Sequence, residues 1–334
     1  MYVLGIETSC DETGASVVYK GKKVCSNVTA SSIKLHSKYG GVIPEIASRA
    51  QLEYISFVVD QAIRKARIKI KDIGLIAVTK GPGLIGSLLV GVSFAKALSF
   101  ANKIPILGVD HVQAHLYAPF LKLGNNGKLP KLPFVGLVVS GGHTTLFHIK
   151  SFDKYKILAD TLDDAAGEAF DKVAKLLGLG YPGGPLVEKI AKSGDRKSYY
   201  FKCGNSEDLN FSFSGIKTAV LYKLQDIKKR GAVTKKQKSD LAASFQNCVV
   251  SVLVEKSIRA VLQKKSNTLV VGGGVAANSY FRQMLYSQAD KKAIKVFIAK
   301  SELCTDNASM IAGLGYQLYR LGKRDSLNFK PLLY

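Results

Sequence analysis

The chain has 334 residues, 47% of them hydrophobic, and a formal net charge of +23 from 48 Lys and Arg residues against 25 Asp and Glu residues. This length predicts two domains. The sequence contains no run of 18 apolar residues, which would predict a membrane helix, and no basic leader precedes the first predicted strand. Both observations favour a soluble, cytoplasmic protein. The positive charge favours nucleic acid as a partner, and five cysteines without a C-x-x-C pair exclude a disulfide framework and a cysteine zinc site.

Strand and helix patterns alternate along the chain, which predicts an α/β protein with parallel strands covered by helices. A basic, loop-like stretch at 122–133 is the best single domain boundary. Asp110 is well placed to cap a helix that starts at His111. The expected strands are 2–7, 15–19, 75–78, 105–109 and 268–271, and the expected helices are 47–68, a segment ending at 100, 163–177 and 239–265.

Three stretches place small and hydroxyl residues directly after an apolar strand: LGIETSCDET at 4–13, VVSGGHTT at 138–145 and LVVGGGVAANS at 269–279. Such turns bring backbone N–H groups close to a phosphate. The first two repeat a strand-turn-strand pattern, so we expect two similar halves that face one nucleotide. A base or ribose is expected over 272–274, with the Asn278 amide beside it. For the glycines of KGPGLIGS at 80–87, which lacks the Walker lysine, close packing is the simpler expectation.

Two of the five histidines form the motif HVQAH, in which His111 and His115 share one face of a helix. They either share a metal or pair by chance, and the spacing alone does not decide between these alternatives. Val112 stands where a zinc peptidase carries its general-base Glu, which excludes that class. Asp306 is either a third ligand or the cap of a helix that begins near Asn307. Two imidazoles and a carboxylate suit Fe(II), Zn or Mn.

A series of longer motifs extends in order from residue 5 to about residue 313 and resembles the bacterial tRNA threonylcarbamoyltransferase family, TsaD. The resemblance implies the actin, sugar-kinase and heat-shock-ATPase (ASKHA) fold, with duplicated lobes and a nucleotide cleft between them. The lobes are then 1–131 and 132–334, and the segment near 305–334 returns toward the cleft. The motifs are GIETSCDET, YGGVIPEIASR at 39–49, HVQAH, VSGGHT, DDAAGEAFDK at 163–172, YPGGP, FSFSGIKT at 211–218, GGGVAAN and TDNASMIA.

The implied reaction transfers the threonylcarbamoyl group of threonylcarbamoyl-adenylate to adenosine 37 of tRNAs that read codons beginning with A, and it releases AMP. The resemblance makes His111, His115 and Asp306 the metal ligands, with Fe(II) favoured and Zn, Mn or Mg possible. It also implies tRNA, the smaller paralogue TsaB and the P-loop ATPase TsaE as partners. The matching adenylate-binding positions are Val138, Val139, Ser140, Gly141, Gly142, Asp171, Gly184 and Asn278, with Glu188 as a ribose partner.

Asp11 and Glu12 in the first loop are candidates to orient or deprotonate the attacking amine. Gln51 is a departure, since family members commonly carry His there. Three other classes share parts of this pattern: a sugar or acetate kinase, a non-catalytic ATPase or scaffold of the same complex, and a nucleic-acid binder. The basic runs at 64–71 and 228–238 are either solvated surface or tRNA contacts.

Overall fold

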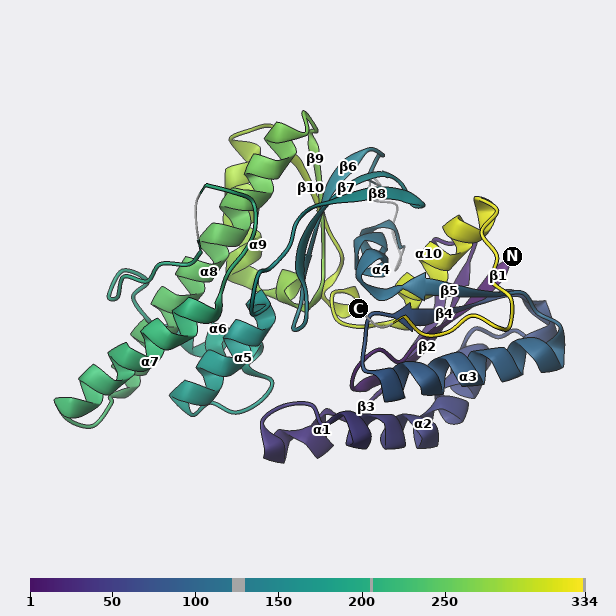
Figure 1. Ribbon diagram of the computed structural model, residues 1–334, viewed down its shortest axis with the longest axis horizontal. Coiled ribbons are helices and arrows are strands. Elements are labelled where there is room, and N and C mark those ends of the chain that lie inside the picture. Colours follow the sequence, from purple (N-terminus) through teal and green to yellow (C-terminus); the bar gives the residue numbers. More distant parts are fainter. Residues whose placement is uncertain (122–129, 205–206, 333–334) are drawn as a thin grey trace. The chain divides into compact units, whose positions relative to one another are not determined.

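The computed structural model describes residues 1–121, 130–204 and 207–332, and it divides the chain into two compact units (Figure 1). Unit 1 comprises Met1–Pro130, Ser151–Lys154 and Ile298–Tyr334, and unit 2 comprises Lys131–Lys150 and Tyr155–Phe297. Most of the loop expected at 122–133 lies outside the described residues. Residues 298–334, which are expected in the second lobe, are part of unit 1.

Unit 1 is built on a five-stranded mixed sheet in the order β3-β2-β1-β4-β5. The first three strands pair antiparallel, whereas β4 and β5 continue the sheet parallel to β1. The strands are β1 (Tyr2–Glu7), β2 (Glu12–Tyr19), β3 (Lys23–Ser31), β4 (Ile73–Gly81) and β5 (Ile106–Asp110), and the main helices are α1 (Ile33–His36), α2 (Pro44–Lys65), α3 (Ile85–Asn102), α4 (His111–Tyr117) and α10 (Ala308–Arg320).

Helices cover both faces of this sheet, which is why its central strands are continuous apolar runs. Leu4 and Ile6 of β1 belong to one core with Val58 of α2 and Val92 of α3. On the opposite face, α10 packs so closely on β1 that a Cβ at Gly5 would lie 2.2 Å from a backbone oxygen of α10. This close packing holds the start of α10 against the end of β1.

Unit 2 repeats the arrangement with a second five-stranded sheet in the order β10-β9-β6-β7-β8. Its antiparallel pair β6/β7 corresponds to β1/β2, and β9 lies parallel to β6 as β4 does to β1. Residues 8–11 connect β1 to β2, and residues 140–143 connect β6 to β7 at the corresponding place. The duplicated α/β topology predicted from the sequence is therefore confirmed. The elements are β6 (Phe134–Val139), β7 (Thr144–Ser151), β8 (Lys154–Ala159), β9 (Thr268–Gly272), β10 (Lys295–Ile298), α5 (Ala166–Leu177), α6 (Gly183–Ala191), α7 (Ser214–Lys229), α8 (Lys235–Gln263) and α9 (Ser279–Asp290).

Helix α5 begins at Ala166 and not at Asp163, the start expected from the sequence. The Asp163 carboxylate instead accepts hydrogen bonds from the backbone N–H groups of Phe213 at 2.7 Å and Ser214 at 3.1 Å. Asp163 therefore satisfies N–H groups at the start of α7, which would otherwise have no partner within that helix.

Helix α3 is the one helix among the described residues that is long and apolar enough to cross a membrane, judged by length and composition alone. A core helix of a soluble protein passes the same test. In unit 1 its residues Leu88, Val92 and Ala95 are buried, while Leu89 and Phe100 are exposed.

Candidate functional site

The predicted histidine pair lies on α4, a short helix that begins directly after β5. Asp110 caps it as expected, since its side-chain oxygen accepts a hydrogen bond from the Gln113 N–H at 2.8 Å. All seven residues of α4 are buried. The rings of His111 and His115 lie edge to face with their centroids 4.8 Å apart. The fold therefore fixes both imidazoles on one side of a rigid helix.

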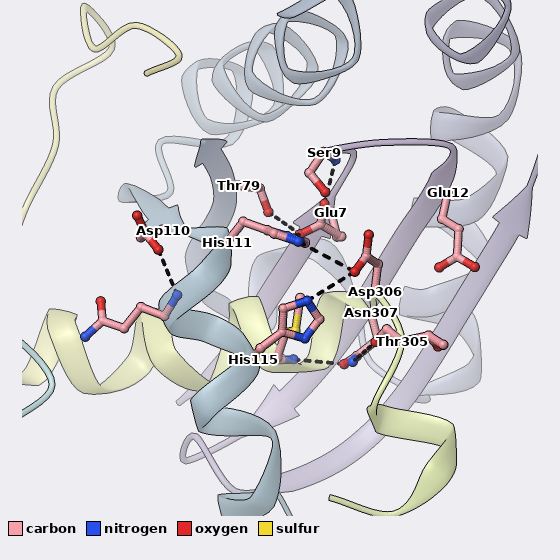
Figure 2. A network of polar contacts seen from close by, with 12 residues as sticks. Glu7, Ser9, Glu12, Thr79, Asp110, His111, His115, Thr305, Asp306 and Asn307 are labelled. Carbon is pink, nitrogen blue, oxygen red and sulfur yellow. Dashed lines mark hydrogen bonds and ion pairs between the residues drawn. The ribbon is translucent and has the colours of Figure 1, made fainter. Parts of the chain in front are cut away.

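Asp306 approaches these imidazoles from the other end of the chain (Figure 2). Its Oδ1 lies 3.2 Å from Nε2 of His115 and 3.6 Å from Nε2 of His111. The N-cap of α10 is the next residue, Asn307, whose side chain accepts a hydrogen bond from the Met310 N–H at 3.1 Å. Asp306 is therefore not the helix cap, and its carboxylate is directed to the histidines.

Glu7, at the end of β1, also belongs to this site, although the sequence analysis did not single it out. It is 1% exposed, and its Oε2 lies 2.9 Å from Nδ1 of His111 and accepts a hydrogen bond from the Thr79 hydroxyl at 2.6 Å. Its Oε1 accepts from the Ser9 N–H at 2.5 Å. Its position at the carboxyl end of the first parallel strand, where α/β proteins bind ligands, was the available signal.

The two buried groups stabilise each other's charge. Burial alone lowers the pKa of His111, but Glu7 and Asp306 outweigh it and raise the pKa to about 9. Burial alone raises the pKa of Glu7, but the charge and hydrogen bond of His111 keep it below its ordinary value. Without a bound ion, the site therefore holds an imidazolium at neutral pH.

The residues fit a divalent metal. One ligand atom each from His111, His115 and Asp306 lies within 4.8 Å of the others. Both ring nitrogens of His115 are buried and have no hydrogen-bond partner among the described residues, which leaves a lone pair for an ion. Glu7 can hold the proton of His111 on Nδ1, so that Nε2 presents its lone pair, as carboxylates commonly do behind metal-binding histidines. Two imidazoles and one carboxylate suit first-row divalent metals.

Asp11 and Glu12 lie at the end of the first loop. Burial, followed by the charges of Asp306, Asp11 and Glu7, raises the pKa of Glu12 to about 8. Burial also raises the pKa of Asp11. A carboxylate whose pKa lies near neutral pH is suited to accept a proton.

Gln51, the residue at which the chain departs from its family resemblance, supports this loop from α2. Its side chain is fully buried, and Nε2 donates hydrogen bonds to the backbone oxygens of Cys10 at 2.9 Å and Glu12 at 3.1 Å. The Ser87 hydroxyl donates to the same Cys10 oxygen at 3.1 Å. The amide therefore fixes the backbone on both sides of Asp11.

The second loop, residues 140–143, has an internally bonded turn and an open tip. The Ser140 N–H donates to the His143 oxygen at 2.8 Å, and the Ser140 oxygen accepts from Gly167 at 3.1 Å. Gly141 and Gly142 are exposed, and nothing lies within 4 Å of where a Cβ would stand on either. Their backbone is accessible to a ligand, whereas the preceding strand residues Val138 and Val139 are buried.

The remaining predicted adenylate positions also stabilise helix starts in unit 2. Asp171 Oδ1 accepts from the Gly183 N–H at 2.7 Å. Glu188 Oε1 accepts from Ser279 N–H at 2.9 Å and from its hydroxyl at 2.5 Å. Asn278 caps α9 through Oδ1, and its Nδ2 donates to Gln246 at 2.9 Å. Gly184 has open space where a Cβ would stand.

Of the glycines at 272–274, Gly273 has a packing reason. Its φ is +97°, and a Cβ there would lie 2.3 Å from the backbone oxygen of Val139 in β6. Gly83, in the turn at 80–87, is similarly close to the first loop, where a Cβ would lie 2.5 Å from the Ser9 oxygen. Gly83 therefore packs as expected, whereas the base or ribose over 272–274 stays a prediction.

Comparison with known proteins gives one consistent family. The family model "TsaD: tRNA N6-adenosine threonylcarbamoyltransferase" matches residues 23–313. A protein of that name from Caldicellulosiruptor bescii is 51% identical over 318 residues, covering 95% of this chain and 92% of that protein. A protein of the same name from Caldicellulosiruptor saccharolyticus is 47% identical over 336 residues, covering 100% of this chain and 98% of that protein.

Among solved structures, HypF of T. kodakarensis is similar in fold. The TM-score is 0.63 at 13% sequence identity, and the match covers 96% of this chain but only 48% of HypF. At this identity the likeness shows the fold alone. Together with the duplicated sheets, it confirms the ASKHA fold class expected from the sequence.

Proposed function

The chain belongs to the TsaD family of tRNA N6-adenosine threonylcarbamoyltransferases, and from this premise we propose how its residues perform that reaction. It transfers the threonylcarbamoyl group from threonylcarbamoyl-adenylate to adenosine 37 of tRNAs that read ANN codons, forming threonylcarbamoyladenosine and AMP. The observation that carries the assignment of chemistry is the convergence of His111, His115 and Asp306, supported by Glu7. A non-catalytic scaffold would have no need of this buried set.

A divalent ion held by these three residues supplies a Lewis acid for the carbamoyl carbonyl. We favour Fe(II), with Zn, Mn or Mg as alternatives. Glu12, in its ionised form, accepts the proton that the N6 amine loses as it attacks, and its raised pKa of about 8 makes this carboxylate a stronger base than an ordinary glutamate. Asp11 orients the amine, and Gln51 keeps both acids in place by holding the loop backbone.

In unit 2, we assign the adenylate phosphate to the open tip of the loop formed by residues 140–143. The N–H groups of Gly141 and Gly142 are the donors for it, since Ser140 uses its own N–H within the turn. We assign the ribose hydroxyls to Asp171 and Glu188. Oε2 is the available Glu188 atom, because Oε1 accepts from Ser279.

Two surface features support the proposed partners. The basic run at 228–238 joins α7 to α8 and offers cations for the tRNA backbone. Leu52 and Phe57 of α2 and Leu89 and Phe100 of α3 are exposed apolar side chains on helices that contact each other. We propose that these exposed apolar side chains contact a protein partner such as TsaB, with TsaE as a further partner, in the cytoplasm.

The test is reconstitution with threonylcarbamoyl-adenylate, unmodified tRNA and the partner proteins, followed by nucleoside mass spectrometry. Threonylcarbamoyladenosine is the expected product, and its absence rejects the function. His115→Ala should lose bound metal and activity together, whereas His148→Ala, a histidine of unit 2 outside the site, should keep both. Full activity in a metal-free His115→Ala protein rejects the metal role.

A further inference from the structure

A second pocket with reactive groups lies in unit 2, formed by α8 and the segment 199–204. Its volume is about 460 Å³, and no residue of the proposed transferase chemistry lines it. On the α8 side, its lining includes Ser244, Cys248, Ser251 and Glu255, which are three or four residues apart and share one helix face. Cys203 lines it from the segment opposite.

Two thiols meet in this pocket. The Sγ atoms of Cys203 and Cys248 are 2.8 Å apart, so the sulfurs need to approach by only about 0.8 Å to reach the ~2.05 Å of a disulfide bond. Cys203 is 8% exposed, whereas Cys248 is partly exposed and accessible from the pocket.

The backbone around the pair is already held in register. The Tyr199 N–H donates to the Ser244 hydroxyl at 3.2 Å, and one helical turn further along α8 the Cys248 thiol, in its protonated form, donates to the Phe201 oxygen at 3.4 Å. The segment 199–204 therefore lies directly against α8 where the two sulfurs meet.

The hydrogen bond between the two sulfurs makes Cys248 the more acidic thiol of the pair. The hydrogen bond from Cys203 lowers the pKa of Cys248, while the same bond and burial raise the pKa of Cys203. Four cationic residues line the pocket: Arg196, Lys197, Lys202 and Lys256. A thiolate in a basic, partly exposed environment is the reactive form of cysteine.

The other cysteines lack this environment. Burial and the neighbouring Asp11 raise the pKa of Cys10, which keeps its thiol protonated. The Cys304 thiol is buried and donates to the Ala299 oxygen at 3.5 Å. Cys25 lies on β3 in unit 1. The pair in unit 2 is thus chemically distinct among the five.

We propose that Cys203 and Cys248 form a redox-reactive dithiol, which hydrogen peroxide converts into a disulfide that ties the segment 199–204 to α8. The Cys248 thiolate attacks one peroxide oxygen, the O–O bond breaks, and the leaving hydroxide takes a proton to become water. The Cys203 sulfur then attacks the resulting sulfenic acid, the S–O bond breaks, and a second water leaves. Two thiols and one peroxide give one disulfide and two waters, with two electrons passing from sulfur to oxygen.

The experiment treats the purified full-length protein with a small molar excess of hydrogen peroxide, without tRNA or adenylate. The mass should fall by two hydrogen atoms, and iodoacetamide should label three thiols instead of five. A non-reducing peptide map should contain one peptide pair joined through Cys203 and Cys248, and dithiothreitol should restore all five thiols. This map uses the wild-type chain, so it does not depend on whether a variant folds.

Variants separate the role of Cys248, which attacks the peroxide, from that of Cys203, which attacks the sulfenic acid. Cys203→Ser should accumulate a sulfenic acid at Cys248 that dimedone traps, and Cys248→Ser should form neither product. Cys25→Ser is the matched control and should still lose two thiols. Retention of five labelled thiols, independent over-oxidation of the two cysteines, or a bond to a different cysteine would overturn the proposal. None of these results bears on the transferase reaction.

Discussion

Replacing Glu7 with Gln should weaken metal binding by forcing His111 into the wrong tautomer. The Ser9 N–H donates to Oε1, so the amide oxygen of the new side chain takes that position and its NH2 group takes the place of Oε2. That NH2 then faces Nδ1 of His111, which must become an acceptor and move its proton to Nε2. Nε2 is the atom nearest Asp306, and once protonated it cannot bind an ion.

The size of the effect follows from the loss of this support. Mutation of a group that orients a metal-binding histidine costs roughly 10- to 100-fold in metal affinity, which is about 1.4–2.7 kcal/mol. Flipping the amide does not avoid the loss, because its NH2 would then face the Ser9 N–H, another donor. Asp306 and His115 keep their positions, so weakened binding and not complete loss is expected.

The assay is competition for Co²⁺ or Zn²⁺ against a chromogenic chelator at neutral pH. Glu45→Gln is the matched control, because Glu45 has a 74% exposed side chain on α2 in a surface ion pair with Arg49. It removes the same charge from the protein far from the site. If Glu7→Gln binds the metal as tightly as Glu45→Gln does, the tautomer explanation is refuted.

In metal-free protein, the raised pKa of His111 contributes stability that is complete below its ordinary value of 6.5 and is lost as pH rises through about 9. Urea denaturation should therefore show a fall in unfolding free energy over that window that His111→Gln lacks; equal profiles would contradict it. Gln51→Ala should lower kcat while metal stays bound, measured by steady-state kinetics and metal analysis; unchanged kcat would exclude its support of the loop. Asp163→Ala should cost about 1–2 kcal/mol of unfolding free energy by denaturant titration, against no change for the exposed Asp226→Ala; equal costs would remove the capping role. Neutralising the lysines and arginine of 228–238 should weaken tRNA binding and flatten its salt dependence; an unchanged slope would show that the run is only solvated.

The sequence predicted those parts of the candidate metal site that depend on local spacing. His111 and His115 share a helix face by their spacing alone, and the cap at Asp110 is a local signal as well. Glu7 could not be placed in this way, because it is 104 residues from His111. Their contact depends on the sheet order, which brings the carboxyl ends of β1 and β5 to the same edge.

In unit 2, sequence could not separate two uses of the same atoms. Carboxylate and amide oxygens accept N–H groups equally well from a helix start and from a ligand. Asp171, Glu188 and Asn278 accept hydrogen bonds from backbone N–H groups at helix starts, and the motifs did not predict these contacts. Edge strands are another omission: the first four residues of β8 are exposed and no residue of β10 is fully buried, so neither strand is a continuous buried run like β9.

Unit 1 is discontinuous along the chain, and this has a consequence for biosynthesis. Its sheet comes from the first 110 residues, yet Asp306 and α10 come from the last segment of the chain. A nascent chain therefore contains both histidines long before Asp306 leaves the ribosome. Prematurely terminated chains lack Asp306 and the packing of α10 on β1, so a truncated product cannot complete the cluster of His111, His115 and Asp306.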